Sequence, residues 1–271
     1  MHVDVWRASS AKVLQRLVAE KKAERWDFDV VSAGGPEMEA LYREGLLQEI
    51  DSPAQRDLIE GTLPAHRGWA PQFINVFVQA YNAELLHKQD LPQTWRDLAE
   101  PRWKGKLGVE AHAAEWYCKL VDALSDGRGI LHAIAARNGL SVREGNSVLA
   151  NLVVSGEVPL ALAVYSHLID AARERGAPVD WFALAPTIAR ANGVGVSRRA
   201  PHPQAARLFY EYSLTEGQPL LVKFHYVSPL KKLSSRFEGG KLLFVDLGAE
   251  SAQVARCDAA YSDLITKAGR R

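Results

Sequence analysis

Residues 76–110 restrict the fold of this chain more than any other stretch. A segment rich in Val and Phe, 75–81, is typical of a buried strand. A Leu-Pro dipeptide then introduces a predicted helix over 91–98, and a glycine turn leads into a second predicted strand over 106–110. Alternating strands and helices predict an α/β fold. The second strand places Glu110 at its carboxyl end, where open α/β sheets bind their ligands.

Composition and charge exclude several classes of protein. The chain has 271 residues, of which 47% are hydrophobic and 24% charged, as in a globular protein and unlike a fibre or a disordered tail. Lys and Arg number 33 against 32 Asp and Glu, so no net field favours nucleic acid or an anionic membrane. No apolar run approaches the ~20 residues that span a bilayer, and the N-terminus lacks the pattern of a signal peptide.

The two cysteines, Cys118 and Cys257, form no CxxC and no cluster with histidine, so the sequence supports neither a zinc site nor a redox motif. We expect two buried thiols, because free cysteine is among the most buried residue types. A disulfide between them is the alternative.

Polar residues follow two further predicted strands. The strand 28–32 leads into the loop 33–36, Ala-Gly-Gly-Pro, which opens a helix over 37–44. Unpaired N–H groups at such a helix start can bind an anion, although a plain tight turn is an equally good interpretation. The apolar run 158–165 predicts a strand buried on both faces, and it ends in the polar triplet 165–167, Tyr-Ser-His.

Several segments resemble one known family. Tyr-Asn at 81–82, LPQTWRDL at 91–98 and WKGKL at 103–107 follow in the order found where ABC-transporter solute-binding proteins pass into their second lobe. DVVSAGGPEMEALYREGLL at 29–47 and GVGVSRRAPHPQAARLFYEYSL at 193–214 are also similar to this family. The resemblance is to the ferric-ion-binding-like branch of the type II periplasmic binding proteins.

The resemblance implies two α/β lobes with a ligand cleft between them, joined by a hinge of two crossing strands at 76–81 and 187–196. Residues 1–78 and 190–271 would form the first lobe and residues 79–189 the second, with C-terminal helices able to bridge both. It also implies a periplasmic or extracellular protein that carries a small solute to an inner-membrane ABC permease.

The beginning of the chain departs from the family pattern. Relatives reach the segment that matches Val3–Trp6, a predicted strand, only after an earlier strand and helix. We therefore expect a signal sequence, a first strand and a first helix to be missing. The first lobe would then expose a sheet edge through which the protein could form oligomers.

The resemblance and the strand ends together indicate a set of ligand-binding residues. Local alternatives stay open for several of them: helix capping for the serines, a helix start for the histidine, and the hydrophobic core for the tryptophan. The set is Ser9, Ser10, Ser32, Ala33, Gly34, Glu110, His112, Trp116, Asn146 and Tyr165.

Iron is the ligand that the branch suggests. Its ferric binders use adjacent tyrosinates, because Fe(III) favours anionic oxygen donors. Here the matching strand end has one tyrosine, Tyr165, so a ferric site would have to draw on Tyr165, His167 and Glu110. Because the adjacent tyrosine pair is absent, a small anionic or polar solute is favoured over Fe(III) as the ligand. No cofactor is expected apart from Fe(III) as a transported ligand.

Three classes of function remain. A solute-binding component of an ABC importer explains most of the chain. An enzyme is disfavoured, because the sequence contains no GxSxG, P-loop, HExxH or GxGxxG motif. A truncated relic or interaction domain that no longer binds a solute is the alternative.

Overall fold

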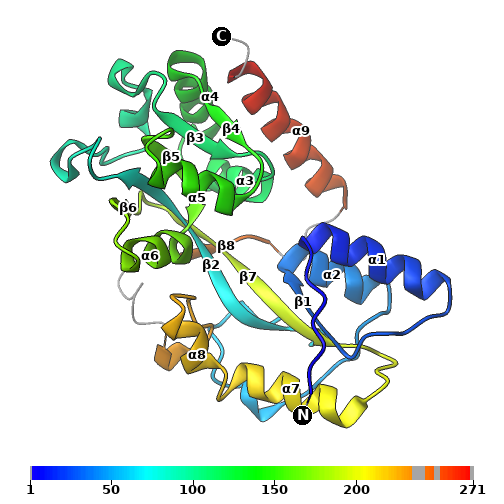
Figure 1. The fold of residues 1–271 in the computed structure, drawn as a ribbon. Coiled ribbons are helices and arrows are strands. Elements are labelled where there is room, and N and C mark those ends of the chain that lie inside the picture. The colour runs from blue at the N-terminus through cyan, green and yellow to red at the C-terminus, as the bar shows by residue number, and fades with distance from the viewer. Residues whose placement is uncertain (1, 234–241, 247–250, 269–271) are drawn as a thin grey trace. The chain divides into compact units, whose positions relative to one another are not determined.

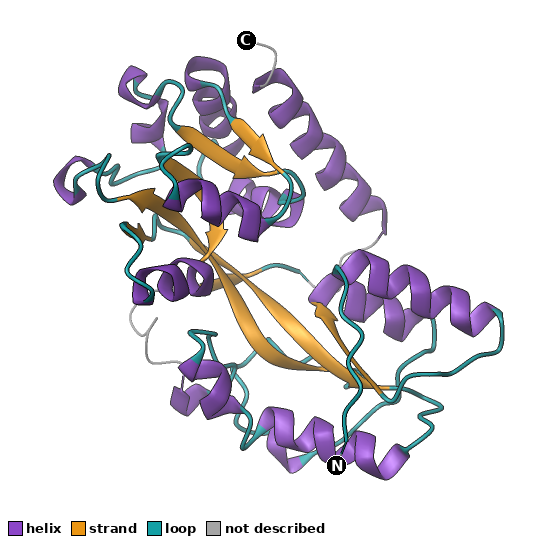
Figure 2. Cartoon of the chain, in the orientation of Figure 1, coloured by secondary structure: helices purple, strands orange, loops and turns teal. Residues whose placement is uncertain are grey.

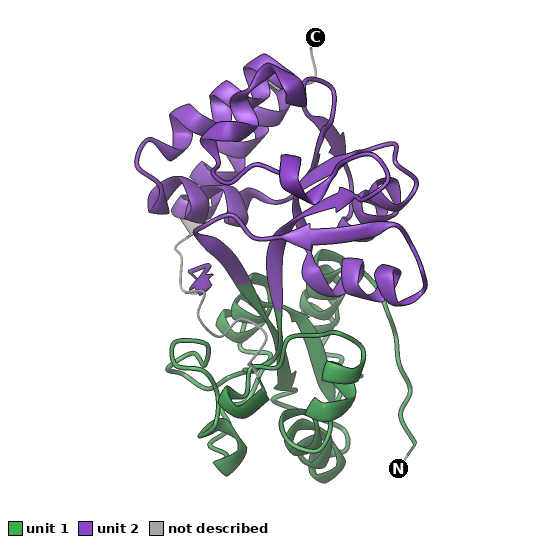
Figure 3. Ribbon diagram, turned by 90° about the vertical axis from the view of Figure 1, so that its left-hand side faces the viewer, with its two compact units in different colours: residues 1–74, 190–238 green, residues 75–189, 239–271 purple. Residues whose placement is uncertain are grey.

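The computed structural model describes residues 2–233, 242–246 and 251–268. The chain divides into two compact units, which Figure 3 colours separately. Unit 1 comprises residues 1–74 and 190–238, and unit 2 comprises residues 75–189 and 239–271. The mixed α/β fold class is confirmed. Residues 239–271 group with unit 2; the sequence analysis assigned 190–271 to the first lobe, with C-terminal helices able to bridge both lobes.

Unit 1 is built around a short strand and its antiparallel neighbour. β1 (Val30–Gly34) pairs with β7 (Thr187–Val196), with Val30 opposite Val196 and Gly34 opposite Asn192. Pro36 lies in the first turn of the next helix, where its missing N–H costs no hydrogen bond. The helices of unit 1 are α1 (Ser10–Lys22), α2 (Gly35–Arg43), α7 (Pro203–Leu214) and α8 (Gln218–Lys223), with short 3-10 turns at Pro53–Gln55 and Lys231–Leu233.

The outer edge of β1 pairs with no other strand of the described residues. The Asp29 carbonyl accepts a hydrogen bond from Ser197 N–H on the side of β7. The N–H and C=O groups of Val30 and Ser32 therefore point away from β7, toward the outer edge. The predicted strand at Val3–Trp6 is wrong, because those residues are irregular and no neighbouring strand pairs with them. Their apolar side chains are exposed.

Unit 2 contains the parallel part of the sheet. Its helices and strands are β3 (Leu107–Glu110), α3 (Ala114–Ala123), α4 (Gly127–Asn138), β4 (Ser141–Arg143), α5 (Asn146–Val154), β5 (Leu160–Tyr165), α6 (Ser166–Glu174), β6 (Val179–Phe182), β8 (Leu242–Phe244) and α9 (Ser251–Ala268). The helix predicted over 91–98 is instead a series of 3-10 turns, Lys88–Asp90, Arg96–Ala99 and Pro101–Trp103. The backbone hydrogen bonds here join residues three apart, such as Asp97 N–H to the Thr94 carbonyl and Glu100 N–H to the Asp97 carbonyl, which is the 3-10 pattern.

Two long strands carry the chain from one unit into the other (Figures 1 and 2). They are β2 (Ala70–Asn82) and β7, and the strand order is β1-β7-β2-β5-β3-β4, with β6 paired to β2 and β8 to β7. β2 is buried along nearly its whole length, as the sequence predicts for 75–81. None of the described helices combines the length and apolar character needed to cross a membrane.

Helix α9 is bound to the rest of unit 2 by a disulfide and by hydrophobic packing. A disulfide joins Cys118 of α3 to Cys257 of α9, with the Cα atoms 5.8 Å apart. The expectation of two free thiols is therefore wrong. Tyr261 and Leu264 of α9 are buried in the same hydrophobic cluster as Leu120 of α3. These contacts explain why the C-terminal helix belongs to unit 2.

Candidate functional site

Three strand-to-helix junctions of unit 2 lie at one edge of the sheet. β3 pairs in parallel with both β4 and β5, so the carboxyl ends of all three strands face the same way. Each strand leads almost directly into a helix: β3 into α3, β4 into α5 and β5 into α6. Such an edge is where open α/β sheets bind ligands, and it carries Glu110, His112, Asn146, Tyr165 and His167.

The helices at this edge begin without side-chain caps. The residues that precede them, Ala113, Gly145 and Tyr165, make no side-chain hydrogen bond to the first turns of α3, α5 and α6. First-turn N–H groups have no partner within their own helix, and the helix dipole adds partial positive charge. The edge therefore offers hydrogen-bond donors from three helices to an anionic or polar group.

Glu110 ties two of the junctions together. One carboxylate oxygen accepts from His112 N–H at 2.7 Å and the other from Gly145 N–H at 3.0 Å. The side chain is buried, and the next residue, Ala111, donates its N–H to the Arg143 carbonyl at 2.8 Å. Glu110 thus orders the loops before α3 and α5. Both of its oxygens are engaged by backbone groups, so it does not present a free carboxylate for a metal.

Aromatic side chains lie at the third junction. The Tyr165 ring stacks on His167 with centroids 5.7 Å apart and is tilted against Phe77 at 5.1 Å. At the start of α5, Asn146 Oδ1 is buried and has no hydrogen-bond partner among the described residues. His112 is exposed, with its Nε2 3.7 Å from Glu144 Oε1.

The expected ferric set is not assembled. Among the described residues, no three His, Cys, Asp or Glu side chains gather closely enough to hold a metal ion. Tyr165 and His167 are neighbours, but the third member, Glu110, is bound to backbone amides. Glu110 is therefore not available as a metal ligand in this arrangement, and the ferric set stays a prediction that depends on Tyr165 and His167.

Trp116 is also corrected. Its side chain is 2% exposed and packs against Trp95 with ring centroids 5.8 Å apart. It belongs to the core of unit 2, as helical spacing allowed, and has no surface left for a ligand.

The remaining predicted residues lie in unit 1, where α1 and α2 begin near each other. Gly34 N–H donates to Ser10 Oγ at 3.1 Å, and Ser9 Oγ accepts from Lys12 N–H as the N-cap of α1. Ser32 is exposed and donates to Gln72 Oε1 at 2.7 Å. Ala33 is buried as a whole residue.

A carboxylate lies over the start of α2, whereas the first turns of α5 and α6 contain no acidic residue. A Cβ added at Gly34 would meet Glu37 Oε2 at 2.5 Å, which shows that the Glu37 side chain folds back over this turn. Glu37 lies in the first turn of α2 and complements the helix dipole there. An anionic solute is therefore expected at the starts of α5 and α6 rather than at this one.

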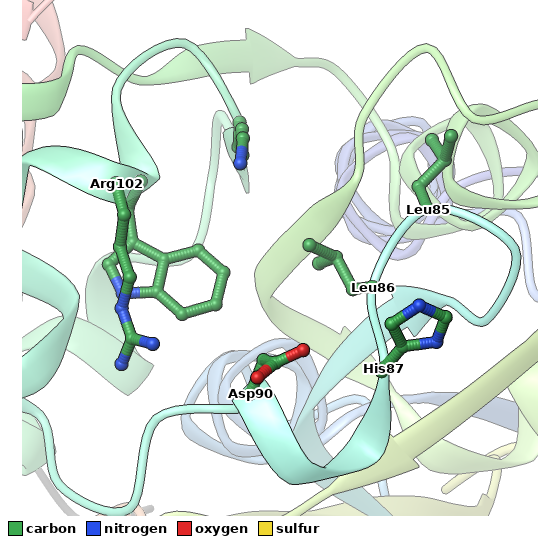
Figure 4. Close-up of a pocket in the computed structure, with 7 residues that line it drawn as sticks. Leu85, Leu86, His87, Asp90 and Arg102 are labelled. Carbon is green, nitrogen blue, oxygen red and sulfur yellow. The ribbon is translucent and has the colours of Figure 1, made fainter.

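A surface hollow of unit 2 lies outside these residues. It measures about 190 Å³ and adjoins a shallower one lined by His87, Lys88 and Gln89. In Figure 4, Leu86, Asp90 and Arg102 surround it. Its lining contains no residue of the three junctions; the full lining is Leu85, Leu86, His87, Asp90, Arg102, Trp103 and Lys106.

Sequence reasoning missed two contributors to the unit 2 edge. Gly145, which the candidate set leaves out, supplies the amide that Glu110 binds, and its position in a polar loop directly before a helix was a usable signal. Tyr261 donates its hydroxyl hydrogen to the Glu110 carbonyl from 151 positions away, and no local pattern marks it.

Comparisons with known proteins agree with the resemblance. A family model described as bacterial extracellular solute-binding protein matches residues 3–218. The Fe(3+)-binding periplasmic protein of Serratia marcescens is 23% identical over 218 residues, which cover 76% of this chain and 64% of that relative. The match thus spans less than two thirds of the relative's length.

Solved structures share the fold. Iron-bound HitA from Pseudomonas aeruginosa has a TM-score of 0.74 at 18% identity, covering 99% of this chain and 91% of that one. AfuA from Actinobacillus pleuropneumoniae, with fructose-6-phosphate bound, has a TM-score of 0.70 at 19% identity, covering 97% and 88%. At these identities the likeness concerns the fold alone.

Proposed function

The chain belongs to the family of bacterial extracellular solute-binding proteins, and from that premise we propose that it is the solute-binding component of an ABC import system. The family places it among binding proteins and not among enzymes. The observation that carries the proposal is the edge of unit 2 where α3, α5 and α6 begin without side-chain caps. The closing of two lobes on the solute, expected from the resemblance, stays a prediction.

A small anionic or polar solute is the ligand that these groups favour. Uncapped helix starts supply N–H donors, Asn146 supplies a buried acceptor, and the Tyr165 ring supplies a flat apolar wall. Ferric ion is the second candidate, because relatives with this fold are described as iron-binding. Two observations weigh against iron. The strand end supplies one tyrosine, Tyr165, instead of an adjacent pair, and both carboxylate oxygens of Glu110 already accept hydrogen bonds from backbone N–H groups.

Thermal unfolding with a panel of solutes tests the proposal. Inorganic phosphate, citrate, fructose 6-phosphate and ferric citrate are suitable probes. A solute at 100 times its dissociation constant should stabilise the folded protein by about 2.7 kcal/mol, which a melting scan detects. Asn146→Ala should reduce that shift, whereas Gln89→Ala, in the shallower hollow outside the junctions, should not. Failure of every probe to raise the melting temperature would favour the non-binding alternative.

The iron alternative has its own test. If Fe(III) binds, Tyr165 coordinates it, and protein mixed with ferric citrate shows a visible charge-transfer band that Tyr165→Phe abolishes. With an organic solute the same change removes one hydrogen bond, roughly 0.5 to 1.5 kcal/mol of binding free energy, and no band is seen. Tyr212→Phe, an exposed tyrosine of α7, is the matched control. We expect no band.

The location and partners of the protein are proposed from its family. We expect a periplasmic or extracellular protein that delivers its solute to a membrane permease, and the Cys118–Cys257 disulfide supports an oxidising compartment. Nearly balanced charge favours no nucleic-acid partner. Self-association through the outer edge of β1 is part of the proposal, and sedimentation at increasing protein concentration would detect it.

A further inference from the structure

We infer that helix α9 positions the solute-binding edge of unit 2, with Tyr261 as the positioning residue and the Cys118–Cys257 disulfide as the latch that keeps the helix in place. The inference rests on the proposed function only for its effect on affinity. Its structural content concerns the loops before α3 and α5, whether or not a solute binds.

Tyr261 acts on the residue that organises both loops. Its hydroxyl donates to the backbone carbonyl of Glu110, the last residue of β3. The carboxylate of the same residue accepts from His112 N–H and Gly145 N–H. Glu110 is therefore held from α9 through its main chain while it holds the two loops through its side chain. Loss of the Tyr261 hydroxyl would leave the end of β3 without this anchor.

The environment of Tyr261 keeps its hydroxyl a donor. The side chain is 2% exposed, and its ring lies 5.5 Å from that of Tyr117 in α3. Burial raises the pKa of Tyr261 above its ordinary value, and the nearby negative charge of Glu110 raises it further. The phenol stays protonated across the physiological range, so the hydrogen bond to the Glu110 carbonyl is retained.

The latch is a covalent link close to this contact. Cys257 lies one helical turn before Tyr261, since residues four apart share a face of α9. Its partner Cys118 lies in α3, the helix whose first turn follows Glu110 and His112. The disulfide thus fixes α9 against the helix whose start belongs to the candidate site. Leu264, one turn further on, is buried in the same cluster.

Amide hydrogen exchange on the solute-free protein tests the positioning directly. Tyr261→Phe removes only the hydroxyl, and we expect faster exchange at the His112 and Gly145 N–H groups. Tyr210→Phe is the matched control, because Tyr210 is a buried tyrosine of unit 1 whose hydroxyl is bonded to Gln55. It should leave those two amides unchanged. A purely structural role for Tyr261 would lower stability without a selective effect at His112 and Gly145.

Opening the latch provides a second variant. The paired change Cys118→Ser with Cys257→Ser should speed exchange at the same amides while circular dichroism stays native. For any solute that stabilises the wild type, Tyr261→Phe should weaken binding roughly two- to tenfold, as expected for one hydrogen bond. If no probe solute binds, the proposed function fails and the exchange data still decide the inference. Unchanged exchange at His112 and Gly145 in both variants would overturn it.

Discussion

At the scale of single residues, hydrogen-bond partners from other segments hold buried polar side chains of unit 2 in position. Glu110 has a backbone donor on each carboxylate oxygen, and Tyr261 has a carbonyl acceptor. His132 of α4 is different, because its Nε2 is buried and has no hydrogen-bond partner in the described part of the chain. An imidazole in that position resists protonation.

His132 should therefore make stability depend on pH. Burial lowers its pKa below the ordinary value, and the nearby Arg128 and Lys267 lower it further against the opposing effect of Asp263. Because the folded pKa lies below the unfolded one, the unfolded state binds the proton first. Stability is full above pH 6.5, the ordinary pKa, and falls as the pH drops below it.

The measurement is the free energy of unfolding between pH 8 and pH 5 for the wild type and for His132→Gln. We expect the wild type to lose more stability on acidification than the variant. His87→Gln, at an exposed loop position, is the control and should follow the wild type. Parallel curves for the wild type and His132→Gln would contradict the prediction.

At the scale of elements, buried side chains packed against strand β7 leave no room for a side chain at Gly193. Gly193 lies opposite Ala33 of β1, next to the turn into α2. A Cβ at Gly193 would approach Trp69 Cε3 to 2.5 Å and Met38 Cγ to 2.8 Å, and both side chains are fully buried. No flexible end of a side chain can move away.

Gly193→Ala should consequently destabilise the protein by about 1–3 kcal/mol through overpacking. Gly129→Ala is the contrasting change, because the added methyl group meets only the carboxylate of exposed Asp126, which can move. It should be neutral or gain up to ~1 kcal/mol from helix propensity. Denaturant unfolding measures both, and equal effects would show that the contact with Trp69 and Met38 does not decide stability.

At the scale of the whole molecule, the Cys118–Cys257 disulfide makes the stability of the fold depend on the redox conditions around the protein. Cys118 and Cys257 are the only cysteines of the chain, so no alternative pairing exists within it. A bridge across 139 positions removes much of the freedom of the unfolded chain. Its formation requires oxidising conditions, as outside the cytoplasm.

Thiol titration of denatured protein checks this prediction. Protein exported to an oxidising compartment should show no free thiol, and protein made in a reducing cytoplasm should show two. The oxidised form should be more stable by roughly 2–4 kcal/mol, the usual contribution of a disulfide. Two reactive thiols in exported protein would mean that the bridge does not form in the native environment.

The sequence by itself determined the family, the α/β class and most elements of unit 2. The predicted strands at 75–81, 106–110 and 158–165 correspond to β2, β3 and β5. These assignments succeeded because hydrophobic patterning and turn-forming glycines act over neighbouring residues. The same local signals placed polar residues at the strand ends.

Only the tertiary structure decided what those polar residues touch. The hydrogen bond from Gly145 to Glu110, the burial of Trp116, the disulfide and the hydrogen bond from Tyr261 to the end of β3 all depend on segments brought together from far apart in the chain. The failed strand at Val3–Trp6 has the same origin, since a strand is stabilised by hydrogen bonds to a neighbour and not by its own sequence. Long-range pairing leaves no periodic mark in the sequence, so contacts of this kind follow from the fold alone.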